Sequence, residues 1–102
     1  MASREVVEKL KKFVSILQEA GIPVEKAFLF GSYLTGSATE ESEIDVMIVS
    51  EHEDDILAGK VWSLTSKVDS RIEPILVGNQ RFAEDNFSPI IDLVKKSGLR
   101  VF

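Results

Sequence analysis

The chain contains no cysteine, so neither a disulfide nor a thiolate metal site can contribute to its structure. Basic residues are also few: 12 Lys and Arg stand against 17 Asp and Glu, for a net charge of -5. No basic cluster is large enough to neutralise several phosphates, which argues against direct nucleic-acid binding. Phosphates bound through metal ions remain compatible with this charge. The single histidine, His52, lies in a charged loop and is assigned no role.

Long apolar runs are absent as well. No run approaches the roughly 20 residues of a membrane-spanning helix. The N-terminus does not follow the pattern of a signal peptide, because charged residues interrupt its first apolar positions. These residues are Arg4, Glu5, Glu8, Lys9, Lys11 and Lys12. We therefore expect a cytoplasmic protein without membrane contact, folded as one domain over residues 1–102.

Hydrophobic periodicity predicts alternating helices and strands. Helices are expected at residues 3–20, 57–68 and 89–97, with a short helical turn at 32–36. Strands are expected at residues 24–30, 43–50, 71–77 and 99–102. Ser3 and Ser88 are candidate N-caps, and either Asp54 or Asp55 can cap the middle helix. This order predicts an α/β fold in which a small mixed sheet carries flanking helices.

Residues 30–49, FGSYLTGSATEESEIDVMIV, contain the most informative pattern of the chain. Gly31-Ser32 leaves a strand and opens a helical turn, where backbone N–H groups and a hydroxyl can meet a phosphate. Glu43 and Asp45 enter the next strand two residues apart, so they share one face, with Cα atoms roughly 6.5 to 7 Å apart. Two such carboxylates repel unless cations lie between them. Mg²⁺ bound with nucleotide phosphates is the usual solution.

Each part of this pattern has a simpler interpretation when taken alone. Gly-Ser is common in turns that merely end a strand. Glu43 and Asp45 could be solvated charges that protect an edge strand from aggregation. Their occurrence in order, with Gly36 and a polar loop at residues 37–42 between them, favours a phosphate and metal site.

Glu73 is a candidate third carboxylate, because it lies inside the apolar strand at residues 71–77. If this strand lies beside the second one, Glu73 can face Glu43 and Asp45. Pro74 favours an edge strand or a bulge. An alternative is that Arg71 pairs with Glu73 on one exposed face. In that case Asp69 is the next candidate for the third carboxylate.

These residues resemble the signature of the minimal nucleotidyltransferases, small members of the DNA polymerase beta-like superfamily. That signature has an apolar residue, Gly-Ser, about ten residues, and an acidic-hydrophobic-acidic triplet. Phe30-Gly31-Ser32 and Glu43-Ile44-Asp45 match it. Residues 71–75 (RIEPI) are similar to the family's third strand, and residues 91–102 to its closing helix and strand. The resemblance implies a nucleotidyltransferase fold.

It also implies a function for each motif. Gly31 and Ser32 would bind the triphosphate, while Glu43, Asp45 and Glu73 would be the catalytic residues and hold two Mg²⁺ ions. The reaction would transfer a nucleoside monophosphate, AMP from ATP, to a hydroxyl. Larger relatives bind the acceptor with an added helical domain, for which 102 residues leave no room.

The resemblance therefore implies an acceptor on another protein. Relatives of this size are often antitoxins that pair with a small helical RNase and adenylylate it on tyrosine; self-association is a further expectation. Two features depart from the pattern: Glu43 replaces the usual Asp, and Leu34-Thr35 replaces a small and a basic residue. They favour an alternative, a catalytically weak module that neutralises a helical partner by contact.

Overall fold

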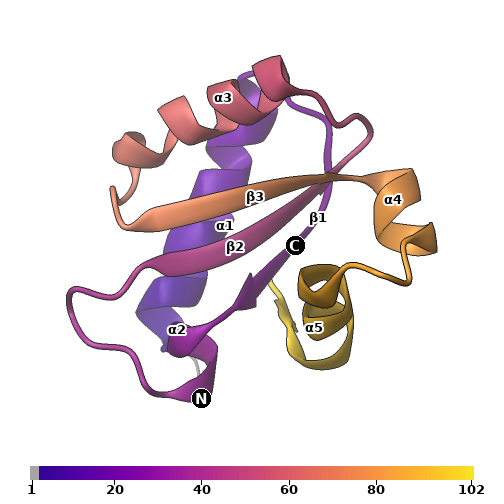
Figure 1. Cartoon of the computed structure of the whole chain (residues 1–102). Coiled ribbons are helices and arrows are strands. Elements are labelled where there is room, and N and C mark those ends of the chain that lie inside the picture. Colours follow the sequence, from indigo (N-terminus) through magenta and orange to yellow (C-terminus); the bar gives the residue numbers. More distant parts are fainter. Residues whose placement is uncertain (1–2) are drawn as a thin grey trace.

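A four-stranded mixed sheet with helices on both faces forms the protein, as the computed structural model of residues 3–102 shows (Figure 1). The strands lie in the order β3-β2-β1-β4; β1 is antiparallel to β2 and β4, and β2 is parallel to β3. The strands are β1 (Val24–Phe30), β2 (Ile44–Ser50), β3 (Ile72–Gly78) and β4 (Leu99–Arg100). The α-helices are α1 (Arg4–Glu19), α2 (Ser32–Thr35), α3 (Asp55–Ser63), α4 (Asn79–Glu84) and α5 (Pro89–Ser97). The predicted fold class is confirmed.

Helix α1 forms because an N-cap at Ser3 and an apolar stripe at helical spacing both favour a helix over these residues. The Ser3 hydroxyl accepts a hydrogen bond from the Val6 N–H, which satisfies one of the free donors at the helix start. Gly21 follows the last turn with a φ of 85°, a conformation that glycine adopts without strain. The buried residues of α1 are Val6, Leu10, Phe13, Val14 and Leu17, the five that the periodicity predicts.

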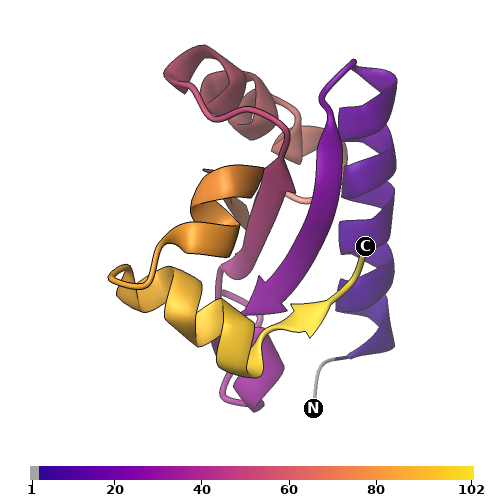
Figure 2. The ribbon, with the colours of Figure 1, turned by 90° about the vertical axis from the view of Figure 1, so that its right-hand side faces the viewer.

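Two apolar clusters cover the two faces of the sheet. The larger contains the α1 residues, and the smaller contains Phe82 of α4 with Ile91 and Val94 of α5. Figure 2 shows α1 on one side of the sheet and α4 and α5 on the other. Strand β2 is buried on both faces, because Val46 and Ile48 face the larger cluster while Met47 and Val49 face the smaller. Its continuous apolar run predicts this burial.

The middle helix is shorter than its apolar spacing predicts. Helix α3 ends at Ser63, and a 3-10 helix (Thr65–Lys67) follows. The Thr65 hydroxyl donates to the carbonyl of Trp62, which is a side-chain bond that competes with regular helical pairing. Strand β2 likewise begins at Ile44, which leaves Glu43 just outside the ladder.

Strand β3 is the edge strand that Pro74 predicts. It lies in register with β2 from the Ile44–Ile72 pair to the Ser50–Gly78 pair. Because the strands are parallel, their first residues meet at the same end of the sheet. Within residues 3–102, no helix is both long and apolar enough to cross a membrane.

Candidate active site

Three carboxylates gather where β2 and β3 begin. Asp45 and Glu73 are direct partners in the parallel ladder, and Glu43 immediately precedes β2. Alternation along the strands points Asp45 to the same face as Met47 and Val49, the face of the smaller cluster. One carboxylate oxygen from each of Glu43, Asp45 and Glu73 lies within 4.8 Å of the other two. The structure thus brings together the three residues that the sequence analysis selects.

Gly31 is packed directly against this cluster. It follows the Phe30–Asp45 pair of the β1–β2 ladder and has a φ of 81°. A Cβ atom at Gly31 would stand 2.2 Å from Oδ2 of Asp45, a distance that no real contact allows. Glycine is therefore required both by the backbone conformation and by the close approach of Asp45.

Ser32 begins helix α2 beside that contact. The carbonyl of Gly31 accepts hydrogen bonds from the N–H groups of Leu34 and Thr35. Gly36 ends the turn with a φ of 84°, and its N–H donates to the carbonyl of Ser32. The first N–H groups of such a turn have no partner inside it, so they can meet an anion.

The three carboxylates repel one another. Burial raises the pKa of Asp45, and the nearby charge of Glu43 raises it further. The pKa of Glu73 is raised chiefly by the adjoining Glu43 carboxyl group, and also by burial and by the charge of Asp45. In both residues the ionised form is disfavoured without a cation.

The donor set fits a hard divalent cation. All three side chains offer carboxylate oxygens, which Mg²⁺ prefers, and opposite ligands of one Mg²⁺ stand roughly 4 Å apart. The oxygen separations of up to 4.8 Å are close to that spacing. A cation between these groups would also relieve their repulsion.

The structure contradicts both alternatives for Glu73. Arg71 does not pair with Glu73: its Nε and Nη2 donate to the two carboxylate oxygens of Asp69 at 3.1 and 2.7 Å. Asp69 also accepts a bond from Nζ of Lys9 at 2.9 Å. Asp69 is thus engaged by two cations near α1 and does not belong to the carboxylate cluster.

One polar network is not indicated by the sequence pattern. Tyr33 packs against the larger cluster, and its hydroxyl accepts a bond from Nη1 of Arg71 at 2.7 Å. These residues are 38 positions apart, so no local pattern indicates the contact. Trp62 of α3 is 48% exposed.

Comparison with known proteins assigns the family. The sequence model of the nucleotidyltransferase domain matches residues 7–101, so the chain belongs to this family and is a nucleotidyltransferase. It is 34% identical over 74 residues to a Methanocaldococcus jannaschii protein named "putative protein adenylyltransferase". That alignment covers 72% of this chain and 74% of the relative.

Solved structures share the fold. A nucleotidyltransferase of Sulfolobus solfataricus aligns with a TM-score of 0.55 at 17% identity, over 74% of this chain and 69% of its own. A toxin–antitoxin structure with AMP-PNP aligns with a TM-score of 0.65 at 23% identity, over 94% of this chain and 72% of its own. A mutant of the MntA-HpeT toxin–antitoxin pair gives 0.64 at 23% identity, over 90% and 71%. At these identities the likeness concerns the fold.

Proposed function

We propose that the chain transfers AMP from ATP to a hydroxyl group of a partner protein, with Mg²⁺ held by Glu43, Asp45 and Glu73. The observation that carries this proposal is the meeting of three carboxylates with the Gly31-Ser32 turn at one end of the sheet. A family in which nucleotides react, and a site rich in hard oxygen ligands, both support it.

Each group has a distinct task in this proposal. Bound Mg²⁺ would activate the acceptor hydroxyl and neutralise the charge that develops on the leaving pyrophosphate. Glu43, Asp45 and Glu73 would hold the cations and so define where the reacting phosphate lies. Gly31 would allow the triphosphate to approach the backbone, and Ser32 would donate its hydroxyl and N–H to it.

A protein acceptor is supported by the relatives. The Methanocaldococcus jannaschii relative is named for protein adenylylation, and two structural neighbours are toxin–antitoxin complexes. We propose that this chain is likewise the antitoxin of such a pair and acts on a small helical partner. The AMP-PNP in one neighbouring structure supports ATP as the nucleotide.

A second candidate function is neutralisation of the partner by contact alone. Glu43, which carries one methylene more than the usual Asp, favours it. A misplacement of about 1 Å can cost roughly a hundredfold in rate. A transfer assay on wild type and on Glu43→Asp distinguishes the two functions. A catalytic chain transfers AMP as wild type, whereas a contact module neutralises its partner without transfer and gains activity, if at all, only in Glu43→Asp.

Thermal melts with Asp45→Asn test the site. The variant keeps the side-chain shape but removes one of three repelling charges, so the apo protein should melt at the same or a higher temperature. Wild-type protein at 100 times the Kd of Mg·ATP should gain about 2.7 kcal/mol in stability, and the variant should lose this gain. Glu25→Gln, an equal charge change at an exposed residue of β1, is the matched control. An unchanged Mg·ATP shift in Asp45→Asn would overturn the assignment.

A further inference from the structure

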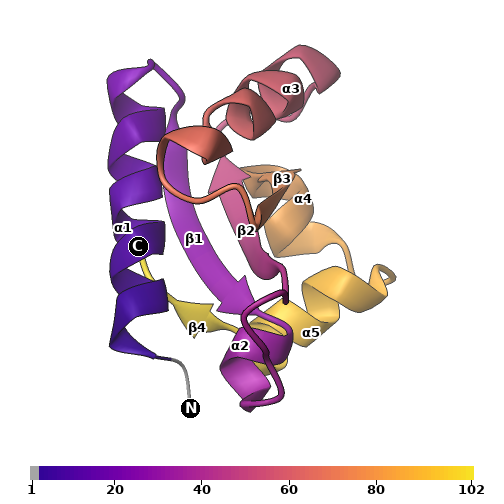
Figure 3. The ribbon, with the colours of Figure 1, turned by 90° about the vertical axis from the view of Figure 1, so that its left-hand side faces the viewer.

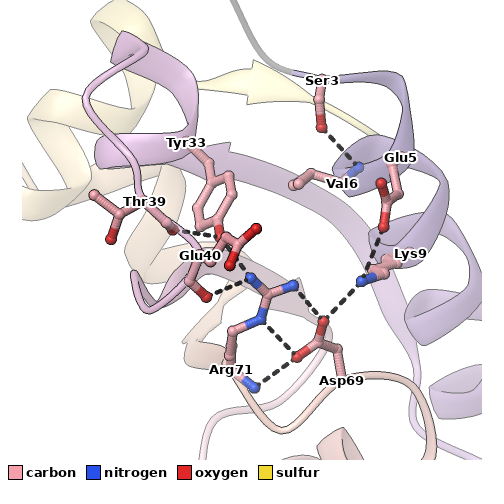
Figure 4. Close-up of polar contacts among 9 residues, drawn as sticks. All are labelled: Ser3, Glu5, Val6, Lys9, Tyr33, Thr39, Glu40, Asp69 and Arg71. Carbon is pink, nitrogen blue, oxygen red and sulfur yellow. Dashed lines mark hydrogen bonds and ion pairs between the residues drawn. The ribbon is translucent and has the colours of Figure 1, made fainter.

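One hydrogen-bond network joins the N-terminal helix to the loop that leads into the carboxylate cluster. The guanidinium of Arg71 lies at its centre and donates hydrogen bonds to Asp69, to the Tyr33 hydroxyl and to the Glu40 carbonyl (Figure 4). The Tyr33 hydroxyl in turn donates to the carbonyl of Thr39 at 3.0 Å. Arg71 is also 5.8 Å from the centre of the Tyr33 ring, within the range of a cation–π contact.

This network lies away from the carboxylates, on the other side of the strands. Tyr33 packs against the cluster that contains α1, and Asp69 pairs with Lys9 of α1. Asp45 and Glu73 face the opposite cluster. A cleft of about 610 Å³ adjoins the network between α1 and residues 38–40. Arg71 and Tyr33 therefore lie on the face of the sheet opposite to the carboxylates.

The network nevertheless adjoins both the Gly31-Ser32 turn and the loop that leads to the carboxylates. Tyr33 directly follows Ser32, and Thr39 and Glu40 belong to the loop that delivers Glu43. The backbone of Arg71 completes the connection, since its carbonyl accepts a bond from the N–H of Ile44 at 2.8 Å, between Glu43 and Asp45. Figure 3 shows α2 and this loop at the end of the sheet where β2 begins.

We propose that Arg71, acting through Tyr33 and the Glu40 carbonyl, is a positioning residue that places Glu43 for metal binding. The inference rests on the proposed function. Asp45 and Glu73 are held by the β2–β3 ladder, whereas Glu43 lies outside it and is exposed. The position of Glu43 therefore depends on the order of residues 37–42, whose other side-chain bonds are short-range contacts such as that of Ser42 to Thr39.

The geometry requires arginine rather than lysine. Nε and Nη2 bind Asp69 while Nη1 binds two acceptors on the other side of the planar group. A lysine ammonium has three donors at one point and cannot span these acceptors together. The Lys9–Asp69 pair steadies the far end of the network.

The experiment compares Tyr33→Phe and Arg71→Lys with wild-type protein and with Arg81→Lys. Arg81 is the matched control, because it lies on α4 and its ion pairs, with Glu53 and Asp85, do not involve residues 37–43. Amide hydrogen exchange of residues 37–43 is measured on the apo protein, and Mn²⁺ affinity by calorimetry. We expect faster exchange in this segment and three- to tenfold weaker Mn²⁺ binding in both variants, about the effect of one or two lost hydrogen bonds. Arg81→Lys should match wild type.

Transfer assays then separate positioning from a general loss of stability. Saturating metal should restore the kcat of Tyr33→Phe, because Asp45 and Glu73 are intact, while the metal concentration for half-maximal rate rises. Variants that melt earlier yet keep wild-type exchange in residues 37–43 and wild-type Mn²⁺ affinity would overturn the inference. If wild type binds Mn²⁺ but transfers no AMP, the proposed function fails on its own. The exchange and affinity data still decide the role of Arg71.

Discussion

Gly31 has the strictest steric requirement of any residue in the site. Its positive φ and its contact with Asp45 both exclude a side chain. Gly21 has a similar φ of 85°, but a Cβ there would meet nothing within 4 Å. Gly31 also has a ψ of -155°, a backbone combination open essentially only to glycine, so its requirement combines strain with crowding by Asp45.

Gly31→Ala and Gly21→Ala form a matched pair of substitutions. Gly21→Ala should lower the free energy of unfolding by about 1–2 kcal/mol, the cost of a left-handed alanine. Gly31→Ala should cost more, because Asp45 must also move. Urea denaturation measures both. Adding Asp45→Ala should recover part of the Gly31→Ala loss, as a double-mutant cycle would show; equal losses in the two single variants would contradict the contact.

Asp69 makes the stability of the fold depend on pH. The hydrogen bond from Arg71 lowers its pKa well below the usual range, and Lys9 lowers it further against the opposing effect of burial. The folded state therefore binds this proton less tightly than the unfolded state, whose pKa is about 3.9. The stabilisation is complete above about pH 5 and is lost as the pH falls through 3.9 toward the folded value.

Asp69→Asn should be less stable than wild type by about 1–3 kcal/mol at pH 7, the cost of breaking a partly buried charged bond. The difference should shrink in urea melts below about pH 4. Asp92→Asn, which removes an exposed ion pair with Lys96, should change little at either pH. A difference between Asp69→Asn and wild type that does not shrink between pH 7 and pH 2 would show that the charge is not its cause.

At the scale of elements, capping residues determine where the helices begin. The sequence leaves Asp54 and Asp55 as alternative caps of α3. The structure selects Asp54, whose Oδ1 accepts a bond from the Leu57 N–H at 2.7 Å, while Asp55 becomes the first helical residue. Only the carboxylate of Asp54 accepts a hydrogen bond from a backbone N–H that has no partner within the helix.

Asp54→Ala should therefore destabilise the protein by about 1 kcal/mol, the usual cost of a lost N-cap. Asp55→Ala removes the same charge from the first turn and should cost only a few tenths of that, through the helix dipole. Thermal melts at low salt compare the two directly. A larger loss for Asp55→Ala would mean that the helix begins one residue later.

At the scale of the whole molecule, charge and shape bear on the choice of partner. The net charge is -5, and the exposed loop before Glu43 adds Glu40 and Glu41 to the acidic end of the sheet. The Arg71 network uses the backbone carbonyl of Glu40 and leaves its side chain available. A basic helical surface would complement this end of the protein.

We expect the Glu40→Gln/Glu41→Gln variant to associate more slowly with the proposed helical partner and to show a weaker salt dependence. Charges at the rim of an interface act mainly on the association rate. Glu8→Gln/Glu19→Gln on α1 changes the net charge equally, away from that loop, and is the control. Stopped-flow association at several salt concentrations measures both; identical rates and slopes for the two variants would place the docking surface elsewhere.

The sequence alone determined most of the elements, though not helix α4, and most of the candidate site, because these depend on neighbours along the chain. Helical spacing set the buried face of α1, and an unbroken apolar run marked β2 as buried on both faces. Glycine beside Ser32 and the spacing of Glu43 and Asp45 follow from turn and strand geometry. Local chemistry does not depend on how the strands are later arranged.

Only the tertiary structure decided which distant groups meet. The parallel pairing of β2 with β3 selected Glu73 over Asp69, because it set Glu73 opposite Asp45. The same pairing left Arg71 to join Asp69 and, across 38 residues, Tyr33. The Thr65 hydroxyl also ended α3 earlier than its periodicity predicts. A carboxylate or guanidinium has several possible partners along the chain, and folding chooses the one that can satisfy its charge and hydrogen bonds at once.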